Sequence, residues 1–189
     1  MKETQAQVNS YHSKDIWFYL REKGFEMFKF LASLIPADCK TILDAGCGQA
    51  LILPHLPKDK IYTGFDLSDF AINKNKNTYK DYPARFVADD LFNPSLNDKF
   101  DCVLLLSVFA QLTPSEILDV VSIAKNRFNP KIIIASSIEE HLTPAVIRKL
   151  KKEFNVVQEL HKTFSLIDNS VGVGTPEQIN NRVILLLER

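Results

Sequence analysis

The sequence predicts a single α/β domain built around a mainly parallel sheet. Short, nearly continuous apolar runs alternate with segments of helical pattern, which is typical of strands buried on both faces. Most of these runs end in an acidic or small polar residue, as strands do when their carboxyl ends border a ligand site. The length of 189 residues suits one domain with a sizeable core. We therefore expect a three-layer sandwich with helices on both faces of the sheet.

The amino-terminal part of the chain differs in pattern from the rest. Residues 1–9 are polar and are expected to be loose. Residues 14–34 carry many aromatic side chains at helical spacing and predict one or two amphipathic helices. We expect residues 1–38 to form a helical extension in front of a ligand-binding domain at 39–189.

Seven strands are expected along the remainder of the chain. The first five alternate with helices, and the last two follow each other without room for a helix between them. That closing pair predicts an antiparallel hairpin at one side of the sheet. The expected strands are 41–46, 61–66, 84–90, 99–107, 130–137, 155–160 and 181–188.

Three helices between these strands have clear local signals. Residues 113–116, TPSE, form a capping box with proline at the first helical position, and the helix is expected to end near Phe128. Thr143-Pro144 opens a second helix that is expected to reach about Phe154. Residues 68–82 also have a helical pattern.

Composition argues against several classes of partner. Basic and acidic residues balance at 23 each, so no overall positive field attracts nucleic acid or an anionic membrane. No apolar run approaches the ~20 residues of a membrane span, and the polar start shows no secretory signal. Cys39, Cys47 and Cys102 have no metal-binding spacing. We expect a cytoplasmic protein without disulfides, a bound metal or a membrane partner.

The glycine-containing stretch at 41–53, TILDAGCGQALIL, predicts a ligand loop. Gly46-x-Gly48 follows an apolar strand, where glycines let the backbone approach a ligand. A dinucleotide fingerprint needs glycine or alanine where this chain has Leu51, and the carboxylate of Asp44 would repel a pyrophosphate. A P-loop is excluded because no G-K-[ST] follows the turn. These details favour a cationic ligand without phosphate.

The motif DAGCGQA resembles the first motif of class I S-adenosylmethionine-dependent methyltransferases, acid-x-Gly-x-Gly-x-Gly, with Ala50 in place of the last glycine. The later stretches YTGFDLS, FVADDL and FDCVLLLSVFAQL resemble the next strand ends of that family, and the last two strands resemble its final hairpin. The resemblance covers about residues 40–189. It implies a Rossmann-like fold, S-adenosylmethionine as the cofactor, and methyl transfer by in-line displacement as the activity.

The resemblance also implies roles for single residues. Asp44 would lie near the amino group and sulfonium, and Asp66 would accept hydrogen bonds from both ribose hydroxyls. Asp89 would face the adenine amine, with Asp90 as the alternative. The residues implied to bind the cofactor are Asp44, Ala45, Gly46, Cys47, Gly48, Asp66, Leu67, Asp89, Asp90, Leu91 and Ser107.

The catalytic residues are less defined, because methyl transfer needs a general base only when the acceptor is still protonated. Small-molecule members of the family often have a histidine where this chain has Gln111. The candidates for a base are therefore Tyr11, His12 and His141. Expected contacts with the acceptor are Tyr11, Trp17 and Phe109.

A small molecule is the expected acceptor. Net charge is zero, and the fourth strand is not followed by the Asn/Asp-Pro-Pro-aromatic signature of methyltransferases that act on base amines. An RNA or protein acceptor is the alternative within the family. Two competing functions are a non-catalytic accessory subunit that binds the cofactor and a nicotinamide oxidoreductase. The sequence leaves the oligomeric state open.

Overall fold

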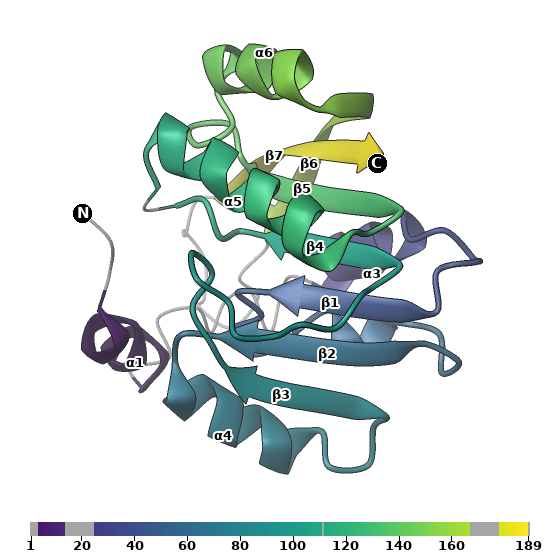
Figure 1. The fold of residues 1–189 in the computed structure, drawn as a ribbon, viewed down its shortest axis with the longest axis vertical. Helices are drawn as coiled ribbons and strands as arrows, with labels where there is room; N and C mark the ends of the chain where they lie inside the picture. Colours follow the sequence, from purple (N-terminus) through teal and green to yellow (C-terminus); the bar gives the residue numbers. More distant parts are fainter. Residues whose placement is uncertain (1–3, 14–24, 111, 167–177, 189) are drawn as a thin grey trace, which may run out of the picture.

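A seven-stranded mixed sheet forms the centre of the molecule (Figure 1). The computed structural model describes residues 4–13, 25–110, 112–166 and 178–188. The strand order is β3-β2-β1-β4-β5-β7-β6; the first five strands are parallel and β7 runs antiparallel between β5 and β6. The prediction of a mainly parallel sheet with an antiparallel carboxy-terminal hairpin is thus confirmed. The strands are β1 Thr41–Ala45, β2 Ile61–Asp66, β3 Ala84–Ala88, β4 Cys102–Leu106, β5 Ile132–Ile138, β6 Asn155–Leu166 and β7 Gln178–Glu188.

Helices cover both faces of this sheet. Side chains of α3 and α4 pack on one face, and side chains of α5 and α6 pack on the other. In Figure 1, α5 lies in front of the sheet and α3 behind it. The helical elements are α1 Gln5–Ser13, α3 Phe25–Ser33, the 3₁₀ turn η1 Leu53–His55, α4 Asp69–Thr78, α5 Pro114–Phe128 and α6 Pro144–Glu153.

The two cores follow from the alternation of side chains along each strand. On β1, Ile42 packs with the α3 side of the sheet, whereas Leu43 packs with the α5 side. Leu104 and Val103 of β4 divide in the same way. All four side chains are fully buried, so both faces of the central strands are dry. This explains why the strands have near-continuous apolar sequences.

The capping signals predict the helix ends correctly. The Thr113 side chain accepts from the backbone N–H of Glu116, whose carboxylate accepts in turn from the N–H of Thr113 at 2.8 Å. At the other end of α5, Asn129 adopts a left-handed conformation (φ 51°) that stops the helix. Thr143 caps α6 through the backbone N–H of Val146. These interactions are local, which is why the sequence alone reveals them.

The expected alternation of five strands with helices is wrong at two connections. Between β1 and β2 the chain forms only η1, because Pro54 and Pro57 interrupt any longer helix. Between β3 and β4, residues 89–101 contain no helix. There the carboxylate of Asp89 accepts hydrogen bonds from the backbone N–H groups of Ser95 and Leu96, which holds this connection as a loop.

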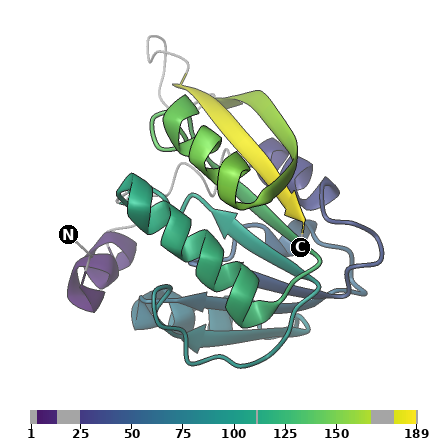
Figure 2. The ribbon, with the colours of Figure 1, turned by 45° about the horizontal axis from the view of Figure 1, so that its top comes forward.

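The first residues are also more ordered than predicted. The segment expected to be loose contains most of α1, which lies beyond the carboxyl ends of the parallel strands (Figure 2). Asn9 ties it to the start of α4: its amide oxygen accepts from the Ser68 hydroxyl at 2.7 Å, and its amide nitrogen donates to Asp69 at 2.7 Å. This contact spans about sixty residues of sequence, so no local pattern could reveal it. Of the helical segment expected at 14–34, the structure describes α3.

No helix among the described residues is long and apolar enough to cross a membrane.

Candidate active site

A cavity of about 720 Å³ lies at the carboxyl ends of the parallel strands, where the sequence predicts the ligand site. Most of the predicted residues meet there, although they come from six separate segments of the chain. Those lining the cavity are Tyr11, His12, Asp44, Gly46, Cys47, Gly48, Asp66, Leu67, Asp89, Asp90, Leu91, Ser107 and His141. Two residues of the predicted set, Ala45 and Phe109, do not line it. Trp17 lies outside the described residues.

The loop after β1 is shaped by its first glycine. The N–H groups of Gly46 and Cys47 both donate to the carbonyl of Phe65 on β2, at 2.8 and 2.9 Å. Gly46 has φ +76°, and a Cβ at this position would lie 2.4 Å from Cγ1 of Val108. Any side chain here would therefore be strained and would also clash with the turn after β4. Glycine therefore lets the loop lie close to the sheet and to Val108.

The second glycine is held by residues of β2 and α4. Gly48 donates its N–H to the carboxylate of Asp66 at 2.8 Å, and its carbonyl accepts from the amide of Asn75 at 2.7 Å. Asn75 is only 1% exposed, so its hydrogen bond to the loop forms away from competing water. Asn75 is absent from the residues predicted from the sequence; the available signal was a polar residue on the buried face of α4.

Ala50 occupies the position where the resembled motif has its third glycine. Its φ of 52° lies in the left-handed region, and its side chain is fully buried. Its N–H donates to the carbonyl of Cys47 at 2.7 Å, which closes the turn. The loop therefore keeps the backbone conformation that a glycine would adopt more easily, at a cost of about 1–2 kcal/mol in an L-residue.

Asp44 is a buried carboxylate at the cavity wall. It is 3% exposed and accepts a hydrogen bond from the hydroxyl of Tyr62 at 2.7 Å. Burial raises the pKa of Asp44 from its ordinary 3.8 to about 7, and the nearby charge of Asp66 acts in the same direction. A cation placed beside this carboxylate would favour its ionised form.

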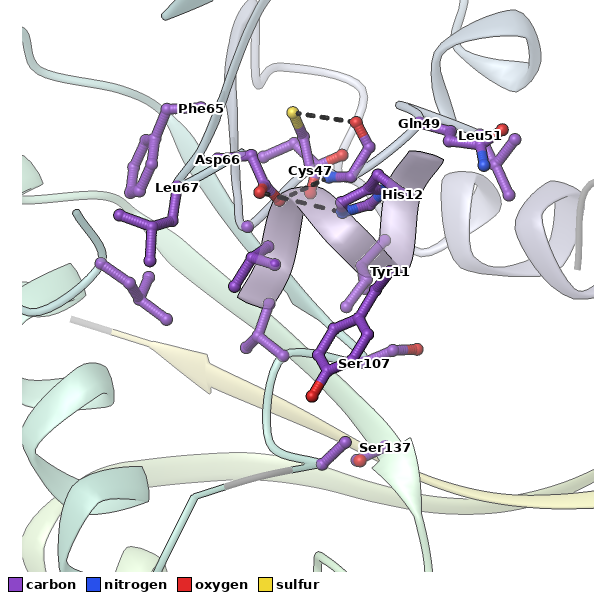
Figure 3. Close-up of a pocket in the computed structure, with 18 of the residues that line it drawn as sticks. Tyr11, His12, Cys47, Gln49, Leu51, Phe65, Asp66, Leu67, Ser107 and Ser137 are labelled. Atoms are coloured by element: carbon purple, nitrogen blue, oxygen red, sulfur yellow. Dashed lines mark hydrogen bonds and ion pairs between the residues drawn. The ribbon is translucent and has the colours of Figure 1, made fainter. Parts of the chain in front are cut away.

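Asp66 ends β2 and is held in one orientation. One carboxylate oxygen accepts from Gly48 and the other from the N–H of Ser68, each at 2.8 Å. The Nε2 atom of His12 lies 4.0 Å from the second oxygen. Figure 3 shows His12 reaching from α1 towards Asp66, with Tyr11 extending to the side where Ser107 and Ser137 lie.

The two acids after β3 differ in their surroundings. The carboxylate oxygens of Asp89 accept from the N–H groups of Asp90, Ser95 and Leu96, so this side chain organises the loop. Asp90 accepts from the N–H of Phe92 through one oxygen at 2.8 Å, and its side chain is exposed towards the cavity. The second oxygen of Asp90 is thus better placed to accept from a ligand.

A polar group that the sequence does not single out lies across the cavity from these acids. Arg182 of β7 is 3% exposed and donates from Nη1 to the hydroxyl of Ser107 at 2.6 Å. Ser107 has φ 63° and donates its N–H to the carbonyl of Ser136. The Ser137 hydroxyl and Nδ1 of His141 lie 3.0 Å apart. The signal for Arg182 was a charge directly before the apolar run at 183–187.

His141 is partly buried at this side of the cavity. Burial lowers the pKa of His141 below its ordinary 6.5, and the charge of Arg182 lowers it further, whereas Glu140 opposes them. The imidazole is therefore mainly neutral at pH 7 and able to accept a proton.

The predicted role of Phe109 at the cavity wall is not supported by its position. The chain turns at Ser107, and the ring of Phe109 enters the core on the α5 side, where it is fully buried. Its neighbours Val108 and Ala110 line the cavity instead. Ala45, also predicted, is buried in the same core.

Metal and thiol chemistry find no support among the described residues. No group of three or more His, Cys, Asp or Glu side chains is arranged to hold a metal ion in that part of the chain. Cys39, Cys47 and Cys102 are buried free thiols. Burial raises the pKa of each thiol, so none is activated as a nucleophile.

Comparison with known proteins agrees with this geometry. A family model described as a methyltransferase domain matches residues 42–131. The structure is similar to that of the N-methyltransferase NodS from Bradyrhizobium japonicum WM9 in complex with S-adenosyl-L-homocysteine, with a TM-score of 0.72 and 15% identity over 100% of this chain and 99% of that one.

Two further structures extend the comparison. Magnesium protoporphyrin IX methyltransferase from Synechocystis PCC 6803 with bound SAM aligns with a TM-score of 0.69 and 17% identity, over 100% of this chain and 98% of the other. A putative RNA methyltransferase from Pyrococcus horikoshii aligns with a TM-score of 0.60 and 13% identity, over 87% and 81%.

A search of curated protein sequences finds no match to the chain. At these low identities the structural likeness shows the fold, while the family model carries the assignment of residues 42–131. The order of the glycine loop and of the acids at the ends of β2 and β3 agrees with this match, so residues 42–131 are similar to a methyltransferase domain.

Proposed function

We propose that this protein transfers a methyl group from S-adenosylmethionine to a small-molecule acceptor, and that both bind in the cavity of about 720 Å³. The observation that carries the proposal is the division of this cavity into two polar halves. Carboxylates of β1, β2 and the loop after β3 line one half, and Ser107, Arg182 and His141 line the other. A cationic cofactor fits the first half and an acceptor fits the second.

The described residues fit this cofactor. Gly46 and Gly48 line the cavity, and Asp44 is a buried carboxylate with a raised pKa, which a nearby cation would lower. We assign Asp44 to the amino group and sulfonium, Asp66 to the ribose hydroxyls and Asp90 to the adenine amine. The preference for Asp90 over Asp89 is supported by the hydrogen bonds of the loop, because each oxygen of Asp89 already accepts at least two. Each oxygen of Asp66 accepts only one backbone N–H, which leaves a lone pair on each for a ribose hydroxyl.

The cofactor supplies an electrophilic methyl group on a positively charged sulfur, which leaves as a neutral thioether when the carbon–sulfur bond breaks. The task of the chain is then to hold the acceptor in line with that bond and to keep water out, which can lower the barrier by several kcal/mol. The acceptor forms the new bond to the methyl carbon and releases a proton if it carries one at the reacting atom.

We assign that proton to His141. Its lowered pKa keeps the imidazole neutral, and the contact between Nδ1 and the Ser137 hydroxyl orients the ring. His12 is the weaker candidate, because its Nε2 lies beside Asp66 and therefore on the ribose side of the cavity. His12 and Tyr11 are better assigned to closing the site.

We further propose that α1 acts as a lid. Gln5, Val8, Tyr11 and His12 line the cavity from this helix, and its tie to α4 depends on the side chain of Asn9. Opening of the Asn9 hydrogen bonds and of the contact between His12 and Asp66 would let the cofactor enter and leave.

The small-molecule acceptor is supported by the balanced charge and by the restricted cavity. One of the similar structures is named for such an acceptor, the magnesium protoporphyrin IX methyltransferase. The putative RNA methyltransferase is the counterexample among them.

Isothermal titration calorimetry tests the cofactor assignment directly. We expect S-adenosylhomocysteine to bind the wild-type protein in the micromolar range and Asp66→Ala to abolish the binding heat. Asp98→Ala is the matched control, since Asp98 forms an exposed ion pair with Arg85 away from the cavity. Absence of heat from either S-adenosylmethionine or S-adenosylhomocysteine with folded wild-type protein would refute the proposed function.

A further inference from the structure

His12 of α1 approaches the carboxylate of Asp66 without bonding to it. Its Nε2 atom lies 4.0 Å from one oxygen of Asp66, which is too far for a direct hydrogen bond. Figure 3 shows the imidazole pointing towards this carboxylate. Both side chains line the cavity and are nearly buried, with exposures of 9% for His12 and 7% for Asp66. Two polar groups therefore face each other at the ribose side of the cavity without satisfying each other.

The two ring nitrogens of His12 have different surroundings. Nδ1 is buried and has no hydrogen-bond partner in the described part of the chain. In the neutral ring, a proton on Nδ1 would therefore be a buried donor without an acceptor, whereas a proton on Nε2 faces the carboxylate of Asp66. This difference assigns the ring proton to Nε2 and places an N–H donor beside Asp66.

The imidazole is held in this position from two sides. Asn9 lies one turn earlier on the same face of α1, and its amide oxygen accepts from the Ser68 hydroxyl at 2.7 Å. On the other side the ring lies against the backbone of Gly48, where an added Cβ would come within 3.3 Å of Cε1 of His12. Glycine at position 48 thus makes room for the imidazole.

The oxygen of Asp66 that faces His12 can accept one more hydrogen bond. It accepts from the N–H of Ser68 at 2.8 Å and has no second donor among the residues that the structure describes. A hydroxyl oxygen can lie about 2.8 Å from both this oxygen and Nε2 of His12, because it need not lie on the line that joins them. A hydroxyl both donates and accepts, so it can donate to the carboxylate while it accepts from the imidazole. A carbonyl or an ammonium group could satisfy only one of the two.

We propose that His12 completes the ribose subsite, with its Nε2–H donating to the ribose hydroxyl that Asp66 accepts. This inference rests on the proposed methyl transfer and on the assignment of Asp66 to the ribose. It gives α1 a direct contact with the cofactor in addition to its role as a lid. One hydroxyl of the cofactor then connects α1 to β2, so cofactor binding favours the closed position of the helix.

The test compares S-adenosylhomocysteine with its 2′-deoxy and 3′-deoxy analogues by isothermal titration calorimetry. In the wild-type protein, removal of the bridging hydroxyl takes away two hydrogen bonds, one to Asp66 and one to His12. We expect that analogue to bind about tenfold to a hundredfold more weakly than S-adenosylhomocysteine. The analogue whose loss depends on His12 shows which of the two hydroxyls forms the bridge.

Variants of His12 identify its share of that loss. His12→Phe keeps a ring against Gly48 but removes the donor, so the loss on removal of the bridging hydroxyl should shrink by about threefold to tenfold, the contribution of one hydrogen bond. His12→Gln places an amide N–H near the position of Nε2 and should keep part of the wild-type loss. Ser13→Ala is the matched control, because Ser13 is an exposed residue of the same helix that does not line the cavity.

Thermal unfolding followed by circular dichroism checks that each variant is folded, and His12→Ala replaces His12→Phe if the larger ring prevents folding. The bridge is wrong if the folded variant without the donor loses as much affinity as the wild type on removal of either hydroxyl. It is also wrong if that variant binds S-adenosylhomocysteine more tightly than the wild type, because His12 would then occupy the position of the ribose.

In both of these cases the methyltransferase proposal stands, since the wild-type protein still binds the cofactor product. If the wild-type protein binds neither S-adenosylhomocysteine nor S-adenosylmethionine, the proposed function itself fails, and the bridge fails with it.

Discussion

Replacing Asp44 by asparagine should stabilise the ligand-free protein and weaken its binding of the cofactor. Asp44 is fully buried in the folded state, with its pKa raised from 3.8 to about 7 mainly by burial. Below about pH 4 the carboxyl group is protonated in both the folded and the unfolded chain. The higher proton affinity of the folded state then makes its full contribution to stability. As pH rises through about 7 the folded group must ionise, and this contribution to stability is lost.

The size of the effect follows from the two pKa values. Each unit of pKa corresponds to 1.36 kcal/mol, so the shift of the Asp44 pKa from 3.8 to about 7 lowers the stability of the folded protein above pH 7 by at most about 4 kcal/mol. Asparagine has nearly the same shape, and its amide oxygen can accept the Tyr62 hydroxyl as Asp44 does. Urea unfolding should therefore show the variant to be more stable than the wild type at pH 8, by up to that amount, and about equal at pH 4.

Cofactor affinity should change in the opposite direction. The variant loses a charge-assisted interaction with the cationic ligand, so calorimetry at pH 8 should show binding weaker by roughly tenfold to a hundredfold. Wild-type affinity should also fall by about tenfold from pH 8 to pH 6, because about one tenth of the Asp44 side chains are ionised at pH 6 when the pKa is about 7. The variant should lack this dependence.

Asp101→Asn is the matched control at the far edge of the sheet. Asp101 accepts from the N–H groups of Lys40 and Thr41 at the end of β1 opposite to Asp44, and these bonds lower its pKa to about 2. Its stabilisation is present above about pH 4 and is lost as pH falls through 2, so the asparagine variant should be destabilised at neutral pH with unchanged cofactor affinity. If Asp44→Asn instead destabilises the protein at pH 8, or leaves affinity unchanged, the assignment of Asp44 is refuted.

Three further substitutions test the loop, the base and the lid. Ala50→Gly should raise stability in urea by less than about 1 kcal/mol, since relief of the left-handed conformation exceeds the loss of one buried methyl; a loss above that size would show that φ 52° is not strained. At saturating cofactor, methyl transfer by the wild type should rise with pH through a pKa below 6.5 and then level, because His141 must be neutral, and His141→Gln should remove this step. An unchanged pH profile would exclude His141 as the base. Asn9→Ala should speed proteolysis within α1 and raise the dissociation rate of S-adenosylhomocysteine in stopped flow, whereas equal rates would remove the lid proposal.

The part of the fold and site that the sequence predicts is the part governed by short-range rules. The carboxyl ends of parallel strands lie at one edge of a sheet, so Asp44, Asp66 and Ser107 could be placed together from the order of the strands alone. The capping box at Thr113 likewise depends on residues three positions apart. Pro54 and Pro57 explain why η1 is so short, and their positions in the sequence could have predicted the absence of a longer helix there.

The remaining errors concern directions of side chains. The sequence places Phe109 at the cavity because it follows β4 closely, but the left-handed turn at Ser107 directs its ring into the core. Asp89 and Asp90 cannot be separated in the sequence, since both follow the same strand. Only the hydrogen bonds of the loop show that Asp89 is already engaged.

The sequence by itself therefore determined the class of fold and which glycine loop and acids meet at the cavity, because strand periodicity, caps and glycine positions act within a few residues. The tertiary structure alone decided what closes the cavity and what lies opposite the cofactor. Asn9 meets α4 across about 60 residues, and Arg182 meets Ser107 across 75. Such contacts depend on how the antiparallel strand β7 and the helix α1 pack against the sheet, and that packing is set by the buried surface of the whole domain.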